Sequence, residues 1–100
     1  MVAVTVDLQD GFMEDTVVIS ADGREVAREA GVSTRFQIGK AKSVQIAVPE
    51  GEVALDVEVP TKNERASVPI DTSKPVFVGV SLTTEGELEI RVQDRPFGYI

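Results

Sequence analysis

An acidic segment near the N-terminus carries residue types that could bind a hard metal ion. Four carboxylates fall within nine residues, on Asp7, Asp10, Glu14 and Asp15. Calcium prefers carboxylate oxygens, so Asp10, Glu14 and Asp15 are candidate calcium ligands. Their spacing differs from that of an EF-hand loop, and Asp7 falls on the outward face of the preceding strand rather than in the loop. The favoured alternative is a solvated acidic turn.

The residue types that enzymes use most often for catalysis are missing. The 100-residue sequence contains no histidine and no cysteine. This excludes Ser-His-Asp triads, cysteine nucleophiles, disulfides and thiolate metal sites. Glycoside hydrolysis needs two carboxyl groups held about 5–10 Å apart across a cleft, for which so small a chain has little room. We therefore expect no enzymatic activity, no catalytic residues and no cofactor.

The charged residues do not form a nucleic-acid footprint. Seventeen acidic residues against ten basic ones give a net charge of −7, which repels phosphate backbones and anionic membranes. Arg24, Arg28 and Arg35 lie in one third of the chain, and the first two could share a strand face and bind an anion. Cross-strand pairing with acidic residues is the favoured interpretation. We expect neither nucleic-acid binding nor membrane insertion.

Large apolar residues occur where polar ones are usual. The acidic loop is interrupted by Phe12 and Met13, and the chain ends with Phe97, Tyr99 and Ile100 among its last four residues. Aromatic residues beside an arginine are typical of protein interfaces, so these five residues are candidates for binding a partner protein or a second copy. The favoured alternative is that the tail folds back to cap one end of the fold while Phe12 covers the other.

Alternation of apolar and polar residues with period two predicts the elements that position these residues. It runs through residues 2–8, 44–48, 53–59, 76–82 and 88–92 and indicates strands with one buried face. Turn residues arrive about every 8–12 residues. We predict one all-β domain over residues 1–100, a single antiparallel β-sandwich of about seven to nine short strands. A small β-barrel is the alternative, since it gives the same alternation.

Individual turn residues add detail to this prediction. Asp22-Gly23, flanked by strand residues, predicts a hairpin with a type I′ turn. Pro60 and Pro69 bracket a charged segment that we expect to be an edge strand or a loop, since proline cannot donate to a central ladder. The N-terminus lacks the pattern of a signal peptide. We expect a cytoplasmic location, with an extracytoplasmic or virion-surface location as the alternative.

These turns resemble those of a known group of proteins. Asp22-Gly23-Arg24-Glu25-Val26, followed by Val48-Pro49-Glu50-Gly51-Glu52-Val53, is similar to small bacterial PEGA-type and prealbumin-like sandwich modules. The resemblance covers about residues 16–60, and the connection from 28 to 39 departs from it. It implies an immunoglobulin-like or prealbumin-like sandwich that serves as a non-catalytic accessory module. It supplies no site residues.

The function we predict is that of a non-enzymatic interaction or assembly module. It would bind a protein partner or itself through Phe12, Met13, Phe97, Tyr99 and Ile100. The alternative is a small module that binds calcium or carbohydrate with the acidic N-terminal loop. Sugar-binding sandwiches usually present several aromatic side chains, and this chain has no tryptophan and one tyrosine.

Overall fold

The alternating segments form eight strands in the part of the chain that the structure describes. This structure is a computed structural model, and it describes residues 1–35 and 37–98. A short 3-10 helix, η1 (Pro60–Lys62), joins the fifth and sixth strands. The strands are β1 (Val2–Leu8), β2 (Asp15–Ala21), β3 (Arg24–Val32), β4 (Lys42–Val48), β5 (Glu52–Val59), β6 (Glu64–Asp71), β7 (Phe77–Leu82) and β8 (Leu88–Gln93).

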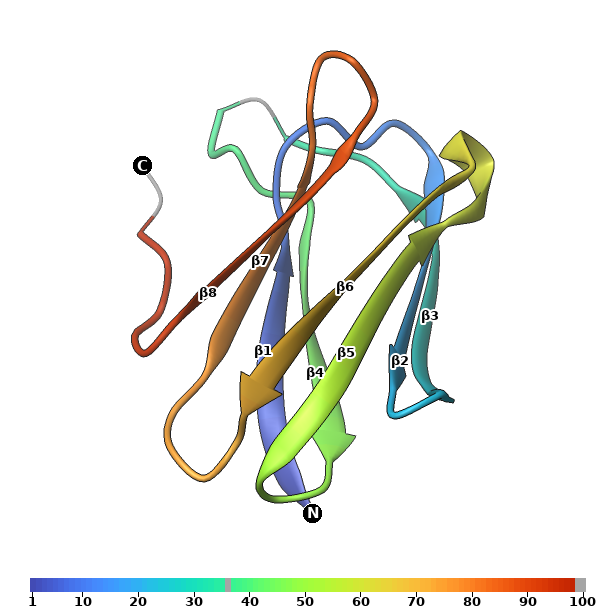
Figure 1. Cartoon of the computed structure of the whole chain (residues 1–100). Helices are drawn as coiled ribbons and strands as arrows, with labels where there is room; N and C mark the ends of the chain where they lie inside the picture. The colour runs from blue at the N-terminus through green and yellow to red at the C-terminus, as the bar shows by residue number, and fades with distance from the viewer. Residues whose placement is uncertain (36, 99–100) are drawn as a thin grey trace.

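The strands are arranged in two facing four-stranded sheets (Figure 1). One, the β1 sheet, has the order β4-β1-β7-β8, and the other, the β2 sheet, has the order β3-β2-β5-β6. The sheets are not joined into a closed barrel, so the sandwich prediction is confirmed and the barrel alternative is wrong. One pairing differs from the purely antiparallel expectation. β1 and β7 run parallel, with Val6 opposite Val78.

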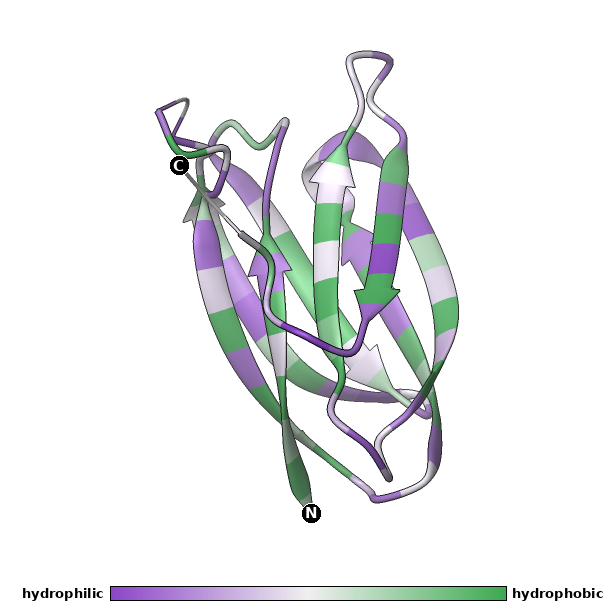
Figure 2. Ribbon diagram, turned by 90° about the vertical axis from the view of Figure 1, so that its left-hand side faces the viewer, coloured by the Kyte–Doolittle hydropathy of each residue, from purple (hydrophilic) through white to green (hydrophobic). Residues whose placement is uncertain are grey.

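The core lies between the sheets and is built almost entirely from aliphatic side chains. Val6, Leu55, Val57 and Val80 are fully buried there. Figure 2 shows apolar and polar residues alternating along the strands, as the sequence pattern predicts. The inward residues of neighbouring strands stack at the same level, for example Val4 of β1 beside Ile46 of β4.

The predicted turn and edge features are confirmed. Asp22 and Gly23 have φ values of 49° and 83°, as a type I′ turn requires, and Ala21 pairs with Arg24 across them. The segment between Pro60 and Pro69 contains η1 and most of β6, which is an edge strand of the β2 sheet. Residues 37–39 form a turn within the β3–β4 connection.

Because successive strands run in opposite directions along the sandwich, its connections gather at two ends. Four of them meet at the end that we call the loop end, namely residues 9–14, 33–41, 60–63 and 83–87 (Figure 1). The segment after β8 turns back instead and crosses the outer face of the β1 sheet (Figure 2). The loop end therefore carries the acidic segment and both residues of the Phe12-Met13 pair.

Candidate interaction site at the loop end

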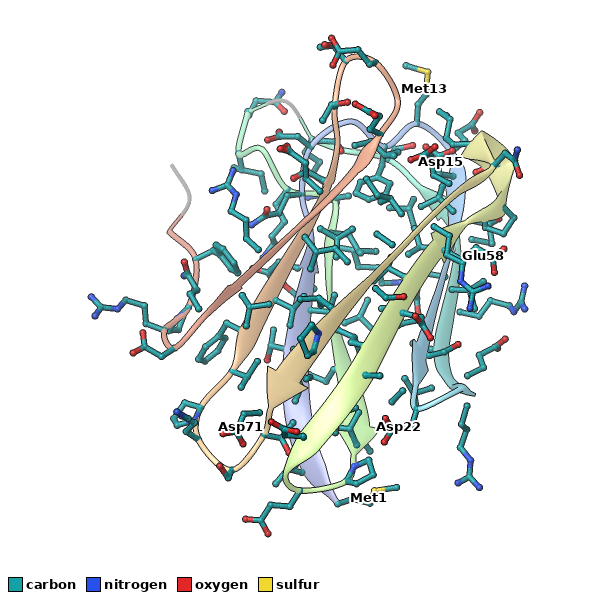
Figure 3. All side chains as sticks on the ribbon, viewed as in Figure 1. Met1, Met13, Asp15, Asp22, Glu58 and Asp71 are labelled. Carbon is teal, nitrogen blue, oxygen red and sulfur yellow. The ribbon has the colours of Figure 1, made fainter. Side chains whose placement is uncertain are left out.

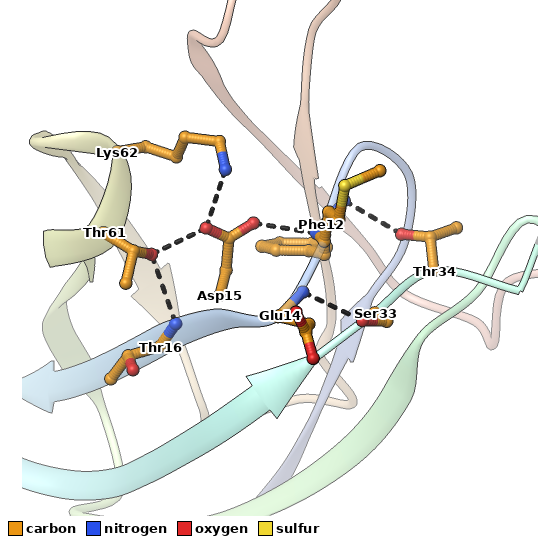
Figure 4. Close-up of polar contacts among 9 residues, drawn as sticks. Phe12, Glu14, Asp15, Thr16, Ser33, Thr34, Thr61 and Lys62 are labelled. Carbon is orange, nitrogen blue, oxygen red and sulfur yellow. Dashed lines mark hydrogen bonds and ion pairs between the residues drawn. The ribbon is translucent and has the colours of Figure 1, made fainter.

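The β1–β2 connection is held in place by hydroxyl groups of the β3–β4 connection (Figure 4). The backbone N–H of Phe12 donates to Thr34 Oγ1 at 3.0 Å, and the N–H of Glu14 donates to Ser33 Oγ at 2.9 Å. Thr34 Oγ1 in turn donates to the carbonyl oxygen of Gln9 at 2.6 Å. The loop thus has fixed partners on both sides of Met13.

Asp15 fixes the other end of the loop. Its side chain is 1% exposed. One carboxylate oxygen accepts the N–H of Met13 at 2.9 Å, and the other accepts Thr61 Oγ1 at 2.6 Å and Lys62 Nζ at 2.9 Å. Burial raises the pKa of this carboxyl group, but the hydrogen bonds from Met13, Thr61 and Lys62 and the charge of Lys62 outweigh it. The pKa of Asp15 therefore lies below its ordinary value.

This arrangement bears directly on the acidic candidates. The solvated-turn interpretation is wrong for Asp15, whose carboxylate is buried and bonded to η1, whereas Asp10 and Glu14 are exposed. The described residues contain no group of three or more acidic side chains placed to hold a metal ion. A calcium site remains a prediction, which thermal unfolding with excess calcium and with chelator would test.

The Met13 side chain is exposed, although the backbone of its loop is held by hydrogen bonds to Ser33, Thr34 and Asp15. Met13 is 70% exposed, whereas the neighbouring Phe12 is 4% exposed and belongs to the core. Figure 3 shows Met13 projecting from the loop end, above Asp15. Phe12 is therefore withdrawn from the candidate interface, because a ring enclosed by core side chains cannot contact a partner. The alternative prediction, that Phe12 covers the core, agrees with this position.

The C-terminal segment takes a different place from the one expected. Phe97 is half-buried and lies on the outer face of the β1 sheet against Gly79, rather than over an end of the sandwich. Gly79 has no side chain, which leaves the space that the ring fills. Tyr99 and Ile100, the other two candidates of the tail, lie outside the described residues. Phe97 and Met13 therefore sit on different parts of the surface.

Asp7 illustrates how the tail changes the outer face. It lies on that face, as predicted, yet it is 7% exposed. Ser43 Oγ of β4 donates to its carboxylate at 2.6 Å, and Gly79, which Phe97 covers, is its neighbour on β7. The outward face of β1 is therefore packed around Asp7, whereas Ala3 on the same face is exposed.

Of the three arginines singled out in the sequence, only Arg28 forms an ion pair within the described residues, and it does so differently from the expected cross-strand pairing. Arg28 pairs with Glu25 of its own strand at 2.9 Å rather than with a neighbouring strand. The β2–β3 register shifts between Ile19 and Ser20, opposite the segment that joins Glu25 to Arg28. This shift breaks the regular alternation of side chains between the two faces of β3, so Glu25 and Arg28 can meet. In the described chain, no ion pair involves Arg24 or Arg35.

A shallow hollow lies beside the Met13 loop. It has a volume of about 420 Å³, and Asp10, Thr34, Lys62 and Thr83 are among its lining residues. Sequence reasoning identified the loop but missed Ser33, Thr34, Thr61 and Lys62, which shape its surroundings. No local pattern signals these residues, because they lie 19 to 47 positions from their partners.

Comparison with protein-family models and with curated proteins finds no match for this sequence. Within residues 1–35 and 37–98, no helix has the length and apolar character needed to cross a membrane.

Proposed function

We propose that this protein is a non-enzymatic interaction module that binds a partner protein through its loop end, with Met13 as the central contact. The observation that carries the proposal is the 70% exposure of Met13 on a loop whose backbone is bonded on both sides. A preordered loop loses little conformational entropy on binding. The resemblance to small accessory modules, which rests on turn residues, points in the same direction.

The chemistry around Met13 defines the partner surface. Methionine is flexible and polarizable, so it fills apolar pockets of varied shape. Exposed carboxylates of Asp10 and Glu14 lie near it in the sequence, and the whole chain carries a charge of −7. We therefore expect a partner with an apolar pocket and a basic rim, because complementary charge increases the association rate and suppresses wrong partners.

Affinity capture with matched baits tests the proposal. The baits are the wild-type chain, the Met13→Ser variant, and a Glu85→Gln variant that changes an exposed residue of the neighbouring β7–β8 turn. A protein retained by the wild type and by Glu85→Gln but lost with Met13→Ser supports the proposed role of Met13. Equal retention by all three baits contradicts it.

A further inference from the structure

β8 is an edge strand that lacks two features that commonly protect such an edge, a proline and an irregular register. The other three edge strands are β3, β4 and β6. β6 contains Pro69, which has no N–H to donate to a further strand. Register irregularities interrupt the pairing of β3, and an ion pair from Lys42 to Glu29 links β4 to β3. β8 contains no proline, and its pairing with β7 is regular over all six residues.

The hydrogen-bond pattern shows which backbone groups of β8 face outward. Thr83 N–H donates to the carbonyl oxygen of Glu87 at 2.8 Å, which makes that pair a hydrogen-bonded one. Bonded and non-bonded pairs alternate along an antiparallel ladder. The N–H and C=O groups of Leu88, Ile90 and Val92 therefore point away from β7. In agreement, Leu88 N–H donates to Glu64 Oε1 of β6 at 3.2 Å.

The same three residues also leave apolar surface incompletely covered. Leu88 and Ile90 pack against the core but are only partly buried, and Val92 is 43% exposed. The tail does not cover this edge, because it crosses the outer face of the β1 sheet (Figure 2). The free edge of β8 thus combines unpaired backbone groups at Ile90 and Val92 with apolar side chains that face the interior of the sandwich.

We infer that β8 pairs antiparallel with β8 of a second copy of this chain, centred on Ile90. The outward-facing residues of β8 include Glu89 and Arg91, both exposed and neither in an ion pair within the described chain. Pairing centred on Ile90 places Glu89 of each copy opposite Arg91 of the other. It also sets Leu88 opposite Val92, so the Leu88 N–H must exchange its bond to Glu64 Oε1 for one to the Val92 carbonyl oxygen. Because the dimer has two-fold symmetry, it contains this Glu89–Arg91 ion pair twice. Glu89 and Arg91 form a non-hydrogen-bonded pair of the ladder, in which opposite side chains lie closer than in a hydrogen-bonded pair.

Neighbouring registers are disfavoured by charge. Hydrogen bonds between the two copies can form only among positions 88, 90 and 92, whose backbone groups point outward. The neighbouring registers that keep such bonds are therefore centred on Glu89 or on Arg91. Centring on Glu89 sets two Glu89 carboxylates opposite each other, although it also sets Arg91 opposite Glu87, and centring on Arg91 sets two guanidinium groups opposite each other. The register centred on Ile90 pairs Glu89 with Arg91 and has no such contact between like charges. The self-complementary charge pattern is what identifies the occupant as a second copy rather than an unrelated strand. The resulting dimer has one continuous eight-stranded sheet.

Charge reversal tests this dimer without disturbing the core. Glu89→Arg and Arg91→Glu each place like charges across the interface at two positions. We expect each single variant to dimerise about tenfold more weakly than the wild type in light scattering over a concentration series. An equimolar mixture of the two variants restores opposite charges at both positions. We expect this mixture to associate within about threefold of the wild-type affinity.

Amide hydrogen exchange provides a second measurement, which reports directly on the backbone groups at the edge of β8. Exchange of the Ile90 and Val92 amide hydrogens should slow as the wild-type concentration rises, because dimer formation gives those groups acceptors. A chain that stays monomeric at millimolar concentration overturns the inference, as does a dimer that the single variants leave unchanged. The inference is independent of the proposed function, so the Met13→Ser variant should dimerise as the wild type does. Failure of the proposed function would appear in affinity capture, and failure of this inference would appear in light scattering.

Discussion

The ring of Phe97 occupies the place where a side chain on Gly79 would begin. A Cβ atom built on Gly79 would lie 2.8 Å from Phe97 Cζ and 2.8 Å from Gln9 Oε1, closer than real Cβ contacts allow. The absence of a side chain at one position of β7 is therefore the condition for the tail to dock on the β1 sheet.

Gly79→Ala should displace the tail. The methyl group forces Phe97 off the sheet, and we expect a loss of about 1–2 kcal/mol in the free energy of unfolding. Limited chymotrypsin digestion followed by mass spectrometry should detect faster cleavage after Phe97. Gln45→Ala, which changes an exposed outward residue of β4, serves as the control. Equal cleavage rates in the two variants would contradict the prediction.

Asp15→Asn should destabilise the protein in a pH-dependent manner. The amide cannot accept from Met13, Thr61 and Lys62 together, and we expect a loss of about 2 kcal/mol at pH 7. The pKa of Asp15 is lower in the folded chain than in the unfolded one, so its contribution is complete above the unfolded pKa. That contribution disappears as the pH falls below about 4 and through the folded pKa.

Urea unfolding at pH 7 and at pH 3 measures this difference. The difference in the free energy of unfolding between the wild type and Asp15→Asn should be smaller at pH 3 than at pH 7. Glu14→Gln makes the same acid-to-amide change at an exposed neighbour and should alter stability by less than about 0.5 kcal/mol. A gap for Asp15→Asn that is constant with pH would show that the carboxylate charge is not responsible.

Thr34→Val should loosen the Met13 loop while preserving the shape of the side chain. It removes the acceptor of the Phe12 N–H and the donor to Gln9, at a cost of about 1–2 kcal/mol. Hydrogen–deuterium exchange should show faster exchange of the Phe12 amide. Thr84→Val, on the exposed β7–β8 turn, should leave that amide unchanged. An unaltered Phe12 exchange rate in Thr34→Val would disprove the role of the hydroxyl.

Gly11→Ala and Gly23→Ala form a matched pair. Both glycines have positive φ, 89° and 83°, so alanine is strained at either position. A Cβ atom on Gly11 would lie 2.1 Å from the carbonyl oxygen of Leu82, whereas nothing lies within 4 Å of one on Gly23. Thermal or urea unfolding should show a loss of about 1 kcal/mol for Gly23→Ala and about 3 kcal/mol or more for Gly11→Ala. Equal losses would mean that backbone strain alone determines the cost.

The strands, the Asp22-Gly23 turn and the edge position of β6 could be predicted because each depends on neighbours along the chain. Alternation identifies a half-buried strand, and Pro69 excludes a central one. The parallel pairing of β1 with β7 could not be predicted, since nothing local distinguishes one buried strand from another as a partner.

The candidate site was predictable only in outline. The sequence places an apolar pair inside an acidic loop, but it does not reveal which side chain turns inward. Phe12 enters the core and Met13 does not. Asp15, which the acidic composition suggested was solvated, is buried and bonded to residues more than 45 positions away. Tertiary contacts therefore decide the roles of adjacent residues.

The parallel pairing of β1 with β7 has a consequence for the order of events during synthesis. About 70 residues separate the paired segments, so β1 leaves the ribosome long before its second neighbour exists. At about 5–20 residues per second, that interval lasts several seconds. During it, β4 can cover only one edge of β1, and the other edge is exposed to any strand nearby. The nascent chain is therefore most vulnerable to misassembly until residue 80 has emerged, and a chaperone that shields extended segments would act in this window.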